Sequence, residues 1–415
     1  MTLKEKSERY GNFLGLMDST RKNKRYGKDS VAHEIHWATQ TFRDLQMRFD
    51  YTFRINGHYA FLTSIPRWRE IIATDFSGRQ TDHELCDPLE PYFEAVLHDR
   101  TYNNRIGKGC QAAINRVMDD IYEVSEGYTK PCRIIKWDLR GFFPNAIWEI
   151  MEKCFVDVIE ANREDLNEKY GEWYADYLRW LTMVVINCNP AAHCELRTPK
   201  HFWKEHIRQD KSILEKEEGV GAPIGRLPSQ KAMGLYINDE IRWLNDDCGI
   251  RATLFMDDCV MVVPEELHLY ALSLFPELRK RLAAKGIKLN EEKFYDQPYQ
   301  HGLEFLGSHI RPNRVHLNAS TISRCKAKIM EMNRCKNKEM ELEHFLGSVN
   351  SYFGLLKNRT DYYKMFELMR MYSLEWWNYS YYNTQKKCIS ANPSQNHKVR
   401  VCRKYNIHFN NKQLN

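Results

Sequence analysis

The stretch Phe255-Met256-Asp257-Asp258-Cys259-Val260-Met261-Val262-Val263 places two adjacent aspartates inside an apolar run. Charged side chains are rarely buried unless they are paired or bind a metal, because they lose hydration when they leave water. Alternation along a strand would send Asp257 and Asp258 to opposite faces, whereas a hairpin turn at these two residues would present both at its tip. The stretch therefore predicts either a surface hairpin with an acidic turn or a cation site.

A second acidic position lies far upstream, in Ile134-Ile135-Lys136-Trp137-Asp138-Leu139-Arg140-Gly141-Phe142-Phe143-Pro144-Asn145. An apolar strand runs into Asp138 and breaks at Gly141 and Pro144. If Asp138 and Asp257 converge, their repulsion requires a neutralising cation. Carboxylate oxygens favour Mg²⁺ or Mn²⁺, and two such ions about 3.5–4 Å apart stabilise in-line attack on phosphorus. The pattern thus indicates phosphoryl or nucleotidyl transfer.

These two stretches resemble the first catalytic motif and the aromatic-x-Asp-Asp box of prokaryotic reverse transcriptases, related to group II intron, retron and diversity-generating retroelement enzymes. Further stretches resemble the family's other motifs, in the family's order: residues 66–72, 82–86, 89–93, 107–110, 219–230, 289–293 and 302–307. The resemblance covers roughly residues 10–360.

The resemblance implies an α+β, right-hand polymerase fold, with fingers, a palm of antiparallel sheet plus helices, and a helical thumb. We expect an N-terminal helical extension over residues 1–50 and fingers and palm over 51–318. The thumb is expected over 319–385, followed by a basic C-terminal tail at 386–415. Glycine at Gly286 suits the end of a helix just before it.

The resemblance also implies the roles of individual residues. Asp138, Asp257 and Asp258 are expected to be catalytic and, with the backbone of Leu139, to hold two Mg²⁺ ions, with Mn²⁺ as an alternative. The residues expected to bind the incoming dNTP are Arg69 on its phosphates, Arg140, Gly141, Phe142 and Phe143 after the first aspartate, Gly225 and Gln230 under the base pair, and Lys293 near the leaving pyrophosphate. Primer and template are expected to contact Phe255, Met256, Phe305, Leu306 and Gly307.

Two of these expectations concern side-chain direction. Alternation predicts that Asp258 points partly away, so that Asp258→Asn is milder than Asp257→Asn. Phe143 occupies the position of the family's steric gate, where a bulky ring would collide with a ribose 2′-OH. The resemblance therefore predicts deoxynucleotide preference, and the alternative for Phe143 is a core aromatic.

The chain departs from the family pattern at two places. Phe255 stands where tyrosine is usual, and Ile224 stands where many relatives have a glutamine that touches the incoming nucleotide. The pattern that ends in Ser229-Gln230 is similar to retroelements that diversify genes and to some phage-defence reverse transcriptases. This similarity implies a function in antiviral defence or in a retroelement, and the missing glutamine puts ordinary fidelity in doubt.

The leading interpretation is an RNA-directed DNA polymerase that copies a dedicated non-coding RNA, with a DNA primer or product and dNTPs as its other partners. A template-independent or weakly templated DNA polymerase and a catalytically inactive RNA-binding scaffold are the alternatives. The intact Asp138, Asp257 and Asp258 argue against the scaffold. A companion protein or a second copy of the chain stays open.

Composition agrees with a nucleic-acid enzyme. The 415-residue chain has a formal net charge of +6, and basic residues gather at residues 21–28 and in the C-terminal tail, where phosphate contact is expected. The 12 cysteines form no disulfide framework, no signal peptide is evident, and no apolar run of about 18 residues exists, so a cytoplasmic protein without a membrane partner is predicted. A zinc site at Cys188, His193, Cys194 and His201 matches no standard spacing.

Overall fold

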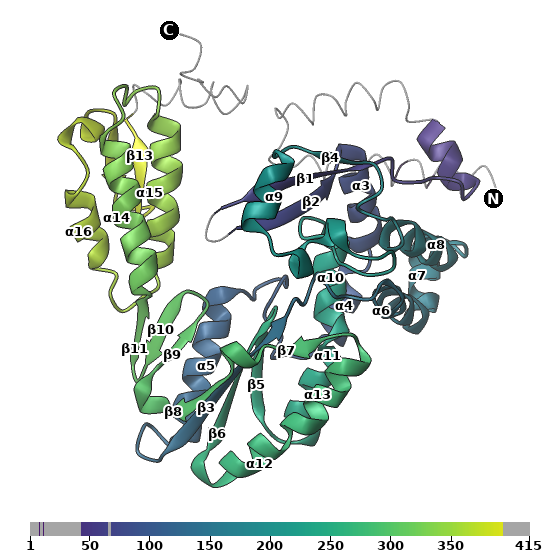
Figure 1. Cartoon of the computed structure of the whole chain (residues 1–415), viewed down its shortest axis with the longest axis horizontal. Coiled ribbons are helices and arrows are strands. Elements are labelled where there is room, and N and C mark those ends of the chain that lie inside the picture. Colours follow the sequence, from purple (N-terminus) through teal and green to yellow (C-terminus); the bar gives the residue numbers. More distant parts are fainter. Residues whose placement is uncertain (1–7, 9–10, 12–42, 65–67, 393–415) are drawn as a thin grey trace. The chain divides into compact units, whose positions relative to one another are not determined.

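The computed structural model describes Glu8, Gly11 and residues 43–64 and 68–392 (Figure 1). Contacts divide the chain into two compact units. Of the described residues, the first unit holds 43–64, 68–120 and 131–297, and the second holds 121–130 and 298–392. Most of the expected N-terminal extension, the basic cluster at 21–28 and the tail after residue 392 lie outside the described residues.

The first unit is built on an antiparallel sheet in the order β5-β6-β3-β7, with β8 also paired to β3. Its strands are β3 (Cys132–Arg140), β5 (Arg251–Phe255), β6 (Asp258–Pro264), β7 (Lys288–Leu289) and β8 (Tyr295–Pro298). Ile135, Trp137 and Leu139 of β3 join the main core, so the residues between them face the opposite side of the sheet. Asp138 therefore lies on the side away from this core.

Helices pack on this sheet and on one another. They are α3 (Phe76–Cys86), α4 (Glu90–Val96), α5 (Cys110–Val124), α6 (Trp148–Ala161), α7 (Arg163–Tyr170), α8 (Tyr174–Ile186), α9 (Lys200–His206), α10 (Leu227–Tyr236), α11 (Asn238–Arg242), α12 (His268–Ser273) and α13 (Phe275–Ala284). Short turns of helix are η1 (Gln209–Lys211), η2 (Ile213–Glu215), η3 (Trp243–Asp247), η4 (Glu265–Leu267) and η5 (Glu291–Lys293). Helix α10 contacts α3, α4, α6 and α8 and so lies inside the helical layer. The expected glycine at the end of α13 is confirmed, since Gly286 has φ +72°.

A smaller sheet in the order β2-β1-β4 belongs to the same unit. Strands β1 (His58–Thr63) and β2 (Arg69–Thr74) are antiparallel, and β4 (Cys194–Leu196) runs parallel to β1. Ala60, Ile72, Trp203 and Ile213 form a core of their own beneath it. The segment between α8 and α10 thus folds against this sheet.

The second unit combines short strands with helices. Its elements are η6 (Tyr299–His301), β9 (Leu303–Phe305), β10 (Ser308–Arg311), β11 (Arg314–Leu317), α14 (Ala319–Asn333), α15 (Leu342–Leu356), α16 (Lys364–Arg370), η7 (Leu374–Asn378), β12 (Ser380–Asn383) and β13 (Cys388–Ala391). Strands β9, β10 and β11 form an antiparallel sheet, and β12 pairs with β13. Helices α14, α15 and α16 share one core, which includes Phe345, Phe353 and Trp376.

The compact units do not coincide with the predicted domains, whose boundaries stay a prediction. In the C-terminal part of the chain the second unit includes Pro298 and the residues after it, so β9–β11 group with α14. The C-terminal tail was predicted from residue 386, but Ile389 and Ala391 of β13 are buried in the core of the second unit. Charge composition alone did not indicate this hairpin.

The helices in the described part of the chain include no candidate for a membrane span, because none of them combines the necessary length and apolar character.

A buried histidine makes the first unit sensitive to acid. His58 of β1 is 4% exposed, and its Nε2 has no hydrogen-bond partner among the described residues. Burial, and to a smaller extent the charge of Arg226, lowers the pKa of His58 to about 3. The unfolded chain, with a histidine pKa of about 6.5, therefore takes up the proton first as the pH falls.

We expect the protein to lose about 2 kcal/mol of stability through His58 between pH 7 and pH 5. The pH dependence of urea unfolding measures this loss, and His58→Leu should remove it. His83→Leu, at a partly exposed histidine of α3, is the matched control and should leave the loss in place. Equal losses in wild type and His58→Leu would contradict the prediction.

Candidate active site

The hairpin of β5 and β6 carries the Asp-Asp pair. The predicted hairpin is confirmed, but its two-residue turn is Met256-Asp257, whereas the sequence predicted Asp257-Asp258. Met256 adopts φ +58°, which suits the tight turns that match the twist of paired strands. Asp258 already belongs to β6, where it pairs with Phe255. The alternation argument therefore does not relate the two aspartates, since one of them lies in the turn.

Asp138 and Asp258 are direct partners across β3 and β6. Side chains that face each other in this way lie on the same side of a sheet. The prediction that Asp258 points away is thus wrong with respect to Asp138. The Leu139 amide donates to the Asp257 carbonyl at 3.0 Å, which fixes the turn against the end of β3. Three aspartates from two distant stretches are brought together.

Two lysines and an asparagine contact these carboxylates. Asp138 is 2% exposed and accepts hydrogen bonds from Asn290 Nδ2 at 2.9 Å and Lys293 Nζ at 2.6 Å. Lys136 Nζ lies 3.3 Å from a carboxylate oxygen of Asp258. The predicted Lys293 therefore lies at the cluster, and its contact with the leaving pyrophosphate stays a prediction.

The charged form of Asp257 is disfavoured by its surroundings. Burial, followed by repulsion from Asp138 and Asp258, raises the pKa of the Asp257 carboxyl above its ordinary value, against a smaller lowering by Lys293. A carboxylate whose charged form is disfavoured in this way gains from a nearby cation.

The donor set fits a magnesium ion that substrate helps to hold. Mg²⁺ is usually bound by one or two carboxylates plus substrate phosphates, with water completing its shell. Among the described residues, no group of three or more His, Cys, Asp or Glu side chains forms a metal site by itself. Residues 188–201, where the sequence offered a zinc alternative, are among the described residues, and no such group forms there. For Asp138 and Asp257, two close carboxylates are what the substrate-assisted mode requires.

The loop after Asp138 closes back on the chain between α9 and α10. Gly141 has φ +61°, and a Cβ there would come within 2.7 Å of Asn145 Nδ2, so the turn requires glycine. The Phe143 carbonyl accepts from the Ala222 amide at 2.8 Å. Phe142 is buried and packs edge-to-face against Phe143 and Tyr236, while Phe143 itself is partly exposed. The exposed Arg140 lies 3.6 Å from Asp210.

A second group of predicted residues lies around β2 and α10. The Ile72 amide donates to the Ile224 carbonyl at 3.2 Å, which joins β2 to the glycine-rich loop. A Cβ on Gly225 would come within 2.7 Å of the Ile72 carbonyl, so this contact depends on glycine. Arg69 begins β2, and Gln230 lies in the first turns of α10. Their contact with a nucleotide stays a prediction.

Glu70, next to Arg69, connects this sheet to the segment before the loop. Its buried carboxylate accepts from Trp203 Nε1 at 2.8 Å, Ser212 Oγ at 2.6 Å and the Ile213 amide at 2.7 Å. Ile213 in turn contacts the position of Gly221. One carboxylate thus fixes the segment between α8 and α10 to β2.

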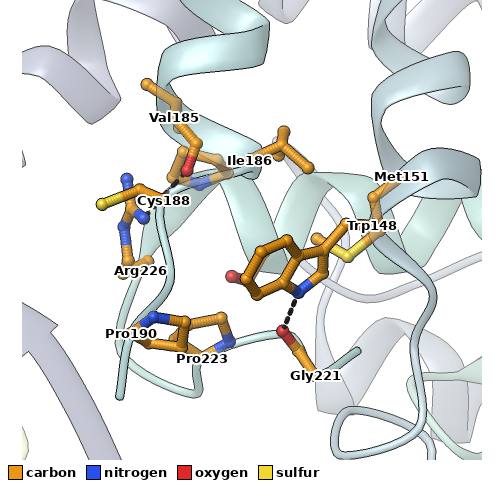
Figure 2. A pocket seen from close by; sticks show the side chains of 11 residues that line it. Trp148, Met151, Val185, Ile186, Cys188, Pro190, Gly221, Pro223 and Arg226 are labelled. Carbon is orange, nitrogen blue, oxygen red and sulfur yellow. Dashed lines mark hydrogen bonds between the residues drawn. The ribbon is translucent and has the colours of Figure 1, made fainter. Parts of the chain in front are cut away.

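A small pocket borders the glycine-rich loop, between α6, α8 and α10 (Figure 2). Trp148 Nε1 donates to the Gly221 carbonyl at 2.8 Å, and Arg226 Nη1 donates to the Val185 carbonyl at 3.0 Å (Figure 2). The free volume inside the pocket is about 10 Å³, and one buried water needs about 10–15 Å³. It therefore supports the loop and is too small for a nucleotide.

The predicted primer-contacting residues are divided between the two units. Phe255 and Met256 belong to the aspartate hairpin, whereas Phe305, Leu306 and Gly307 belong to the second unit. Leu306 and Gly307, with φ of +49° and +74°, form the turn between β9 and β10. Phe305 is 1% exposed, so its ring is buried and only its backbone could reach a primer.

Two residues of the cluster were not assigned from the sequence. Lys136 lies two residues before Asp138 on the same strand, so alternation could have placed it on the same face. Asn290 lies in the stretch already quoted for Lys293. Its Nδ2 donates to the Asp138 carboxylate at 2.9 Å, and its backbone amide donates to the Asp138 carbonyl at 2.8 Å. Both bonds depend on the pairing of β7 with β3. No local pattern indicates such a pairing.

No family model matches this chain, and no curated protein matches its sequence. Solved structures of telomerases are similar to it. The apo telomerase from Candida tropicalis has a TM-score of 0.48 and 11% identity, over 73% of this chain and 52% of that chain. The Candida tropicalis telomerase in complex with a TWJ fragment of telomeric RNA has a TM-score of 0.45 and 12% identity, over 77% of this chain and 53% of that chain. The corresponding Candida albicans complex has a TM-score of 0.41 and 13% identity, over 78% and 56%. The chain thus spans about half the length of these telomerase chains.

Proposed function

We propose that this chain is an RNA-directed DNA polymerase that copies a dedicated RNA by two-metal nucleotidyl transfer, in an antiviral defence system or a retroelement. The observation that supports this most is the convergence of Asp138, Asp257 and Asp258 at the ends of adjacent strands. A scaffold protein would gain nothing from three clustered carboxylates, of which Asp257 is held at a cost to its charged form.

The polar groups around the cluster have roles that suit this chemistry. Bound Mg²⁺ would stabilise the charge that develops on the attacking and leaving oxygens, and Asp138 and Asp257, with Asp258 and the Leu139 carbonyl assisting, are the groups proposed to hold it. Lys293, which is paired with Asp138, would donate a proton to the leaving pyrophosphate or stabilise its negative charge. Amide groups of residues 140–142 would receive the triphosphate, because the Leu139 amide already donates to the Asp257 carbonyl.

The test begins with purification of the chain together with its co-purifying nucleic acid. That material is sequenced, and Mg²⁺-dependent dNTP incorporation is measured beside the variant Asp257→Asn/Asp258→Asn. A defined RNA with complementary DNA that is lost in the variant would support the proposal. DNA of simple repeat without a matching RNA would favour the weakly templated polymerase. If the wild type incorporates no nucleotide with any of the candidate template RNAs, the result would favour the scaffold.

Phe143 is proposed to exclude ribonucleotides. Its ring is partly exposed and packs edge-to-face against Phe142, and this contact limits the positions that the ring can adopt. We expect Phe143→Ala to raise ribonucleotide incorporation relative to deoxynucleotide incorporation by about 10²-fold, because a steric clash of a few kcal/mol is removed. Competition between dNTP and rNTP in a primer-extension assay measures this ratio.

Phe142→Ala is the control for a general loss of packing. It should lower stability and total incorporation but shift the sugar ratio less than Phe143→Ala does, since Phe142 is buried and acts on the ratio only through its contact with Phe143. Unchanged sugar selectivity in Phe143→Ala would overturn the assignment of Phe143.

A further inference from the structure

The segment 100–104 runs along the outer edge of β5. The Leu254 amide donates to the Arg100 carbonyl at 2.9 Å, and the Tyr102 amide donates to the Leu254 carbonyl at 3.0 Å. Thr101 and Leu254 form a parallel bridge. Arg100 is anchored in turn by the buried Asp120, which accepts from Arg100 Nη2 at 2.9 Å. The segment is thus a short added strand that leads toward the aspartate turn.

This segment ends on the backbone of Met256. Asn103 is 3% exposed, and its side-chain carbonyl accepts from the Met256 amide at 3.1 Å. Asn104 Nδ2 lies 3.8 Å from the Met256 sulfur. The ladder of β5 and β6 ends at Phe255 and Asp258, so the Met256 amide has no partner in that ladder. Asn103 therefore supplies the hydrogen bond that the turn itself does not.

Met256 needs this support because of its conformation. A residue other than glycine at φ +58° carries backbone strain, because its Cβ comes too close to the following carbonyl oxygen. Such conformations persist where the surroundings hold them, and they concentrate at functional sites. The strained residue directly precedes Asp257, so any relaxation at Met256 would move the Asp257 carboxylate.

We propose that Asn103 is a positioning residue for the aspartate cluster, holding the turn Met256-Asp257 so that Asp257 stays beside Asp138. This inference rests on the proposed polymerase function for its catalytic consequence. The hydrogen bond itself is tested without activity. Neither Asn103 nor Asn104 touches the three carboxylates, so the effect acts through the backbone of the turn.

The experiment compares three variants. Asn103→Leu keeps the side-chain size and removes the acceptor, whereas Asn103→Asp keeps an acceptor oxygen. Asn238→Leu is the matched control: Asn238 is 4% exposed and bonds backbone in the same unit, accepting from the His98 amide at 2.8 Å and donating to the Val96 carbonyl at 3.1 Å. Asn103→Ala replaces the leucine variant if that variant does not unfold cooperatively.

Two readouts are taken. Hydrogen–deuterium exchange of peptides that contain Met256 should be faster in Asn103→Leu than in wild type and unchanged in Asn238→Leu. Loss of a supporting hydrogen bond at a metal site costs about 10–100-fold in activity or metal affinity. We therefore expect kcat for nucleotide incorporation to fall by about that factor in Asn103→Leu, with KM for dNTP unchanged, and to recover in part in Asn103→Asp, which restores the acceptor but adds a negative charge near the aspartates.

Unchanged exchange at Met256 in Asn103→Leu would overturn the inference, and so would equal losses of kcat in Asn103→Leu and Asn238→Leu. Full kcat in Asn103→Leu would overturn it as well. A wild-type protein that incorporates no nucleotide would instead contradict the proposed function, while the exchange measurement would still decide whether Asn103 holds the turn.

Discussion

Replacement of Asp257 by asparagine is expected to lower Mg²⁺-dependent nucleotide incorporation by about 10³-fold or more. The asparagine side chain is neutral and binds a hard cation weakly, so several kcal/mol of charge stabilisation in the transition state are lost, and each 1.4 kcal/mol corresponds to about tenfold in rate. Single-turnover primer extension at saturating dNTP measures the chemical step. Asp138→Asn should cause a loss of similar size.

The stability of these variants distinguishes catalysis from folding. Burial and the neighbouring Asp138 and Asp258 already disfavour the charge of Asp257, so Asp257→Asn should unfold at the wild-type temperature or above it. Asp258→Asn is the graded control and should be milder, because Lys136 at 3.3 Å already compensates that charge and Asp258 is 26% exposed. Incorporation by Asp257→Asn within tenfold of wild type, or a greater loss in Asp258→Asn, would contradict the proposed roles.

Replacement of Arg226 by methionine is expected to destabilise the first unit by about 3–5 kcal/mol. Arg226 and Asp82 form an ion pair at 2.5 Å, with side chains 3% and 2% exposed. Burial alone would lower the pKa of Arg226, but the contact with Asp82 outweighs it and the net pKa is raised. Removing the guanidinium leaves a buried carboxylate without its partner, which is the costly event. Urea unfolding followed by tryptophan fluorescence measures the loss.

The double variant Asp82→Asn/Arg226→Met is the decisive comparison. It removes both charges and should recover most of the stability lost in Arg226→Met, because no unpaired charge stays buried. Arg163→Met provides a surface control, since Arg163 and Glu160 are 32% and 38% exposed, and it should cost about 1 kcal/mol or less. Equal destabilisation by Arg226→Met and Arg163→Met would show that the buried pair is not structurally important.

Arg226 also connects stability to the proposed site. It lies between Gly225 and the first residue of α10, and Asp82 lies in α3. The pair therefore holds the end of the glycine-rich loop against a helix that is distant in sequence. The hydrogen bond between Ile72 and Ile224 joins β2, which carries Arg69, to the same loop. The loop leads directly into α10, which carries Gln230.

Several local features could be predicted from sequence because short-range patterns encode them. The apolar runs before Asp138 and after Asp258 predicted both strands, and Gly286 marked the end of α13. Proline near the start of α4, α10 and α13 agrees with its preference for the first helical turn. The turn of the aspartate hairpin was misplaced by one residue, because aspartate is favoured in turns and methionine at positive φ is not.

The amino-acid sequence by itself determined the two strands, the adjacent carboxylates of Asp257 and Asp258 and the preference of carboxylate oxygens for a hard cation, since these follow from residue type and from spacing along a few residues. Tertiary structure alone decided that Asp258 faces Asp138, that Asn290 and Lys293 reach the same carboxylate, and that Asn103 holds Met256. These contacts join residues that are more than a hundred positions apart. They depend on strand register and on the packing of segments whose pairing no local pattern specifies, because register is set by the summed burial of whole strands.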